Sequence, residues 1–206
     1  LEPATIKNND EESVWNLTAG RQATIDNARK AADMGVDMIV LTGNPGVGVD
    51  NEAILQALSK LKDAVGDRVI LTAGKMHASG IISEAGEKIL TEKDIVDFID
   101  AGADVILLPA PGTVPGITME YAGKLIKKAH EKGALAMTTI GTSQEGADED
   151  TIRQIALMCK MAGADIHHIG DSGYMGMALP ENITAYSVAI RGKRHTYRRM
   201  AMSLLR

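Results

Sequence analysis

A glycine recurs along this chain at nearly constant intervals, and this repeat restricts the fold more than any other feature. Each glycine closes an amphipathic helical segment and precedes a short apolar run; the five are Gly35, Gly66, Gly102, Gly133 and Gly163. Their spacings of 31, 36, 31 and 30 residues match the length of one βα unit. Three of the repeats are also similar in sequence: MGVDMIVLTG, AGADVILLPA and AGADIHHIGD. The repeat predicts an α/β protein built from tandem βα units.

The apolar runs after the glycines predict parallel strands. They cover residues 38–42, 69–73, 105–109, 136–140 and 166–170, and continuous apolar runs are typical of parallel strands covered on both faces. Between them, Asp50, the capping-box pair Thr91 and Asp94, and Asp148 or Asp150 mark helix starts. The composition does not change between units, which indicates a single domain over residues 1–206. Two architectures fit this order, a (β/α)8 barrel and an open doubly wound sheet.

Length favours a (β/α)8 TIM barrel that is truncated at its N-terminus. Such a barrel typically takes about 250 residues, whereas this chain has 206 and begins at Leu1. Residues 1–3 would end an earlier strand and residues 21–35 would form its helix, so that the last five to six βα units are visible. Missing units leave unpaired strand edges, and we therefore expect a homo-oligomer.

Composition and charge exclude several classes of protein. The chain is 45% apolar with one cysteine, which predicts a globular, cytoplasmic protein with Cys159 in its core. It has neither a membrane-length apolar run nor the blocks of a signal peptide. Residues 191–206, a predicted basic helix, carry six cationic side chains and no acid, so the net charge of −5 leaves −11 on residues 1–190. An acidic body with 3% aromatic residues argues against nucleic acid. The basic end is either a solvated helix terminus or a surface for an anion or another subunit.

Aligning the strands on their preceding glycines predicts which side chains face a barrel mouth. Polar residues on this face gather at the carboxyl ends of the strands, where TIM barrels have active sites; they are Thr42, Asn44, Lys75, Thr142, His168 and Ser172. Lys75 can form a Schiff base or hold an anion; the alternative is a solvated loop lysine. His77 is its candidate acid–base partner or a surface histidine, and Glu2 is a candidate general acid or base.

Two glycine-rich loops follow the last two strands and predict a phosphate site. Backbone N–H groups in such loops approach phosphate closely; the candidates are Gly141, Thr142 and Ser143 in one loop and Gly170, Asp171, Ser172 and Gly173 in the other. Ordinary tight connections are the alternative. No metal site is predicted, because the adjacent His167 and His168 point to opposite faces, and no cofactor is predicted.

Five sequence motifs are distinctive: VLTGNPG from Val40, LTAGKMH from Leu71, GDSGY from Gly170, PENI from Pro180 and IRGKRHTYRRM from Ile190. Together they resemble an uncharacterised bacterial family of TIM-barrel proteins found near sugar phosphotransferase genes. The resemblance implies a barrel fold and a sugar-phosphate setting, without assigned catalytic residues. Some members are labelled haloacid dehalogenase-like hydrolases, but the Asp-x-Asp motif of that chemistry does not follow a strand here.

Together these features predict a small-molecule enzyme acting on a phosphorylated sugar or related metabolite at the barrel mouth. The chemistry expected is of the lyase, aldolase or isomerase type, with fold analogy as its main support. The alternative is a non-catalytic sensor or structural subunit that binds a sugar phosphate.

Overall fold

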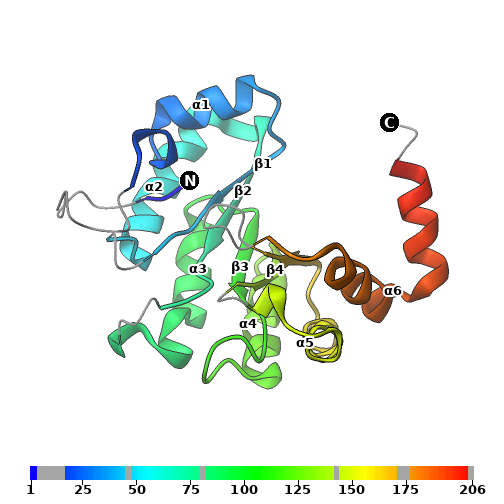
Figure 1. The fold of residues 1–206 in the computed structure, drawn as a ribbon. Helices are drawn as coiled ribbons and strands as arrows, with labels where there is room; N and C mark the ends of the chain where they lie inside the picture. Colours follow the sequence, from blue (N-terminus) through cyan, green and yellow to red (C-terminus); the bar gives the residue numbers. More distant parts are fainter. Residues whose placement is uncertain (4–16, 45–47, 79–81, 142–143, 171–176, 204–206) are drawn as a thin grey trace.

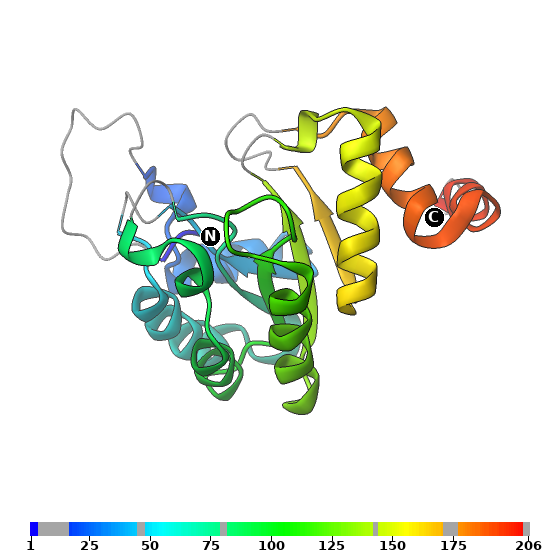
Figure 2. The same ribbon diagram turned by 90° about the horizontal axis from the view of Figure 1, so that it is seen from below.

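The sheet of this protein has five parallel strands paired in chain order. The computed structural model describes residues 1–3, 17–44, 48–78, 82–141, 144–170 and 177–203. Each strand pairs in parallel with the next; they are β1 (Met38–Leu41), β2 (Ile70–Gly74), β3 (Val105–Pro109), β4 (Leu135–Ile140) and β5 (Ile166–Ile169). The sheet curls into a half-barrel with helices on its outside (Figures 1 and 2). The predicted barrel-type order of parallel strands is confirmed, and no antiparallel pairing occurs among the described strands.

Helices alternate with the strands, and three of them begin at the capping residues that the sequence predicts, whereas the helices predicted over residues 21–35 and 191–206 begin at Ile25 and Pro180. They are α1 (Ile25–Asp33), α2 (Asn51–Val65), α3 (Glu92–Asp100), α4 (Met119–Glu131), α5 (Glu149–Ala162) and α6 (Pro180–Ser203). Asp50 caps α2, Thr91 and Asp94 form the capping box of α3, and Asp148 caps α5. All five repeat glycines have φ between 58° and 110°, a conformation that favours glycine where a helix must end and the chain must turn into a strand.

The first residues of the chain extend the sheet beyond β1. The N-terminal amine of Leu1 donates to the Val40 carbonyl at 2.6 Å, and the Thr42 N–H donates to the Leu1 carbonyl at 3.2 Å. On its other side, Glu2 forms a parallel bridge with Gln22. Residues 1–2 therefore lie as a strand-like stretch beside β1, as expected from the βα order.

The two faces of the sheet bury different sets of side chains. The outer face packs against the helices in a large cluster that includes Ile39, Leu41, Leu71, Ala73 and Ile106, continued by Ile140 and Cys159 under α5 and α6. The concave face holds a smaller cluster of Val105, Leu107 and Met137, with Met38, Val40 and Ile166 against it. The expected burial of Cys159 is confirmed.

The glycine alignment assigns the faces of β2 and β4 wrongly. On β2 the concave face carries Thr72 and Gly74, in register with Val105 and Leu107, while Leu71 and Ala73 face the helices. On β4 it carries Met137 and Thr139, not Ala136, Thr138 and Ile140. The physical reason is that β1, β3 and β5 follow a Gly-x-Asp turn of constant length, whereas the chain enters β2 and β4 without that aspartate, one residue out of phase.

The Gly-x-Asp turns before β3 and β5 tie each of these strands to the strand before it. Asp104 accepts the Leu71 N–H at 2.8 Å and donates its own N–H to the Leu71 carbonyl at 2.8 Å. Asp165 does the same with Ala136, at 2.8 and 3.0 Å, and its carboxylate also lies 2.7 Å from His130 Nε2. The aspartate thus replaces a ladder partner at the start of the strand and sets its register.

Replacing Asp165 by Ala should lower the free energy of unfolding by about 1–3 kcal/mol near neutral pH, because the buried Ala136 N–H loses its acceptor. Partial burial tends to raise the pKa of Asp165, but hydrogen bonds from His130 and the Ala136 N–H outweigh it and hold the pKa below its ordinary value. This stabilisation is therefore present above the unfolded-state pKa and is lost as the pH falls through the lower folded-state pKa.

Urea denaturation of both proteins across this acidic range measures the effect. Asp165→Asn is the matched control, because its amide oxygen still accepts the Ala136 N–H. A stability difference between Asp165→Ala and the native protein that is unchanged in acid would contradict the assignment.

Candidate functional site

Lys75 follows β2 at the carboxyl end of the sheet and is almost completely buried, with 1% of its surface exposed. The backbone here is tightly packed: a Cβ added to the preceding Gly74 would lie 1.8 Å from the Leu107 carbonyl oxygen. Glycine is therefore required where β2 reaches β3, and it sets the point from which Lys75 leaves the sheet. The alternative of a solvated loop lysine is wrong, since a buried ammonium is expensive unless it serves structure or chemistry.

Buried polar side chains also lie at the end of β1, the strand that pairs with β2. Glu2 and Asn44 are 6% and 7% exposed, and Glu2 forms an ion pair with Arg21. A Cβ on Gly43 would come within 2.9 Å of Glu2 Cγ, so the carboxylate of Glu2 lies directly over the β1–α2 connection. Thr42, half-buried, completes this group at the carboxyl end of β1. Glu2, Thr42 and Asn44 thus lie at the same end of the sheet.

The concave face changes from apolar to polar toward the same end of the strands. Gly74, Leu107, Met137 and Ile166 share one level of the register. One level further on, Pro109, Thr139 and His168 are neighbours, and the Thr139 hydroxyl has no hydrogen-bond partner among the described residues. The hydroxyl of Thr139 and the imidazole of His168 therefore lie next to the apolar level, on the side of the strands' carboxyl ends.

Glycines close this level of the concave face. Gly141 and Gly170 directly follow β4 and β5 and are buried. A Cβ on Gly141 would come within 2.9 Å of Met76 Sδ, so the residue after Lys75 reaches across to the end of β4. His77, half-buried, follows on the same connection. The ends of β2 and β4 are thereby in contact, and the candidate residues on them belong to one region.

The two histidines of β5 point to opposite faces, as predicted. His167 faces the helices, where its Nδ1 lies 2.9 Å from the Tyr186 hydroxyl of α6. Burial lowers the pKa of His167 and raises that of Tyr186, so the pair remains neutral and joins α6 to the sheet. His168 is left on the concave face.

Part of the predicted phosphate site lies outside the described residues. This applies to Thr142, Ser143, Asp171, Ser172 and Gly173, whose roles remain predictions. The connection from Gly74 to Leu90 contains the short turns Ile82–Glu84 and Gly86–Ile89 and returns through the buried Ile89 and Leu90; its residues 79–81 are not described.

Glu145 and Asn182 are candidate residues that the sequence analysis missed. Glu145 follows β4, is 8% exposed, and its Oε2 has no hydrogen-bond partner in the described part of the chain. Asn182, 2% exposed on α6, donates from Nδ2 to the carbonyls of Glu145 and Ala147 at 2.9 and 2.8 Å. Glu145 could have been identified from the sequence as an acid in the glycine-rich segment that follows β4. No sequence pattern links Asn182 to Glu145.

Replacing Asn182 by Ala should destabilise the protein by about 1–3 kcal/mol and loosen the β4–α5 connection, because two buried carbonyls lose their donor. Faster hydrogen exchange confined to residues 144–148, measured by mass spectrometry, checks the effect. Thr184→Ala is the control, since among the described residues the Thr184 hydroxyl bonds within its own helix, to the Pro180 carbonyl. Equal exchange in both variants would remove the role assigned to Asn182.

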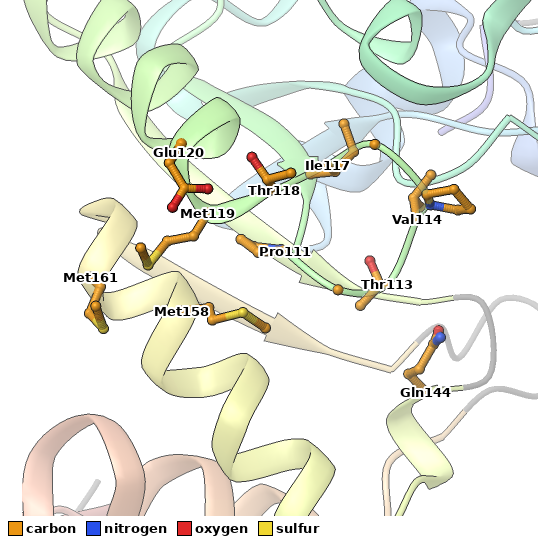
Figure 3. Close-up of a pocket in the computed structure, with 13 residues that line it drawn as sticks. Pro111, Thr113, Val114, Ile117, Thr118, Met119, Glu120, Gln144, Met158 and Met161 are labelled. Carbon is orange, nitrogen blue, oxygen red and sulfur yellow. The ribbon is translucent and has the colours of Figure 1, made fainter.

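A separate hollow of about 720 Å³ lies between the β3–α4 connection and α5 (Figure 3). Its lining is mainly apolar, with Pro111, Met119, Met158 and Met161, and Glu120 contributes an acid. Met161 is 69% exposed. The hollow lies on the helix side of the sheet, away from the concave face.

The described residues contain neither a cluster of metal-binding side chains nor a helix suited to span a membrane. Within those ranges, His, Cys, Asp and Glu side chains nowhere gather in threes as a metal would require. None of the described helices combines the length and apolar character needed to cross a membrane.

The curled parallel sheet and the polar carboxyl ends of its strands define a TIM-barrel-type protein. Two solved structures have a similar fold. A deoxyribose phosphate aldolase from Aeropyrum pernix has 16% sequence identity and a TM-score of 0.58, and the match covers 84% of this chain and 67% of that one. A putative phosphonomutase from Burkholderia cenocepacia has 18% identity and a TM-score of 0.56, and the match covers 84% of this chain and 76% of that one. The chain belongs to the family described as a domain of unknown function (DUF7916), whose model matches residues 1–206.

Sequence similarity also reaches curated proteins. A Haemophilus influenzae protein named putative N-acetylmannosamine-6-phosphate 2-epimerase is 37% identical over 89 residues, and an Actinobacillus pleuropneumoniae protein of the same name is 36% identical over 88. The matched stretch covers 43% of this chain and 33% of each relative. The similarity thus spans about a third of the length of these curated relatives.

Proposed function

We propose that this protein is an isomerase acting on a phosphorylated sugar, with an N-acetylated amino sugar phosphate as the first substrate to test. The observation that carries the proposal is the burial of Lys75, 1% exposed, at the carboxyl end of a barrel strand. The similarity to proteins named as a 6-phosphate 2-epimerase supports the substrate class. The fold supports the location of the site.

Epimerisation beside a carbonyl needs a base, an acid and a cation. A base removes the proton from the carbon next to the carbonyl, the electron pair moves to the carbonyl oxygen, and a proton returns to the opposite face of the same carbon. We assign the proton transfers to His168, with Glu145 or Glu2 as the second acid–base group. The Lys75 ammonium stabilises the developing oxyanion, which such fixed charges do well in a water-poor site. Gly141 and Gly170 offer room for a phosphate to approach the backbone.

Proton exchange at the carbon beside the carbonyl tests this function directly. The protein is incubated with N-acetylmannosamine 6-phosphate in D2O, and proton NMR follows loss of the C2 proton and appearance of the epimer. Lys75→Met should reduce turnover by about 100-fold or more, while Lys88→Met, an exposed lysine in the same connection, should leave it unchanged. Substrate that stays fully protonated with the native protein would overturn the isomerase proposal.

Two other outcomes identify the alternatives. An aldolase using Lys75 as a Schiff base would give a mass increase on Lys75 after borohydride treatment with a carbonyl substrate. A non-catalytic sensor would be stabilised by the sugar phosphate, by roughly 2.7 kcal/mol at 100 times its dissociation constant, without any exchange at C2. Either result would replace the isomerase assignment.

A further inference from the structure

The C-terminal part of α6 leaves the body of the protein as a separate helical arm, which we define as residues 193–203. α6 breaks at Gly192, whose φ of 76° and ψ of 160° are not helical. Beyond this break the arm points away from the sheet and the other helices in both views (Figures 1 and 2). Side chains confirm the separation, because every residue from 193 to 202 is exposed except Thr196.

Few side chains of the arm are buried. A short isolated helix is marginal in water, and among residues 193–202 Thr196 is the one buried side chain. Tyr197 and Met200, 56% and 55% exposed, lie three residues apart on one side of the arm, and Lys193 and Arg194 lie on the same side next to them. A surface that receives these two side chains therefore needs to be apolar with an acid close by.

The body of the same chain provides such a surface. The hollow between the β3–α4 connection and α5 is lined by methionines, which adapt to apolar side chains of many shapes, and Glu120 lies within its lining. Met161 at its border is 69% exposed, so the hollow lacks a cover in the single chain. Residues 1–190 carry a net charge of −11 against +6 on residues 191–206, which makes the body of a second copy electrostatically complementary to the arm.

We propose that the arm of one copy docks through Tyr197 and Met200 into the methionine-lined hollow of a second copy, forming a dimer by exchange of arms. Gly192 sets the direction of the arm, because its backbone conformation is essentially restricted to glycine. Reciprocal docking buries Tyr197 and Met200 of both arms and places Lys193 and Arg194 beside the acidic body. The proposal is independent of the catalytic assignment, since neither the arm nor the hollow contains a residue assigned to it.

Sedimentation equilibrium of the native chain and of surface variants tests the dimer. The native chain should be a dimer whose dissociation constant rises with salt. Tyr197→Asp in the arm and Met161→Glu in the hollow should each weaken dimerisation by roughly 30-fold, the effect of losing an interface anchor. Met34→Glu is the matched control, because Met34 is a methionine 83% exposed at the end of α1, and it should remain dimeric.

A Gly192→Ala variant examines the arm's direction without changing its surface. It should also weaken the dimer, because alanine disfavours the break and lets α6 continue straight. Circular dichroism verifies that each variant is folded. A monomeric native chain, or dimers unaffected by both Tyr197→Asp and Met161→Glu, would overturn the proposal. A monomer that instead sediments with phosphatidylserine vesicles would make the arm a lipid-binding helix and would equally overturn it.

Discussion

The Gly-x-Asp turn is the constraint on which the rest of this structure depends. Glycine at positive φ ends a helix, and two residues later the aspartate carboxylate and N–H take the place of a ladder partner for the preceding strand. This arrangement joins β3 to β2 and β5 to β4 before the new strand starts. Because the turn has a constant length, the strands that follow it present the same face to the concave side.

That register decides what stands at the carboxyl ends of the strands. Apolar residues fill the lower level of the concave face, and Thr139 and His168 stand together above it. Strand alternation puts Lys75 on the same side as Leu71 and Ala73, which face the helices. Lys75 is nevertheless buried, and the Gly74 before it lies against the backbone of β3. Lys75 and the polar upper level of the concave face both lie at the carboxyl ends of the strands, the region where parallel α/β barrels bind their ligands.

α6 has two roles that differ along its length. Its first half carries Asn182, which holds the β4–α5 connection, and Tyr186, which bonds His167 of β5. Its second half begins after Gly192 and makes little contact with the body. One helix therefore supports the candidate site at one end and presents an apolar and basic surface at the other.

The sequence by itself determined the order of strands and helices, their caps and the carboxyl-end location of the candidate residues, because these follow from local periodicity, side-chain capping and glycine conformation. It also separated His167 from His168, since strand alternation is a local rule. Only the tertiary structure decided the faces of β2 and β4, the burial of Lys75 and the link from Asn182 to Glu145. These depend on the phase in which the chain enters a strand and on contacts between segments more than thirty residues apart, which no local pattern records.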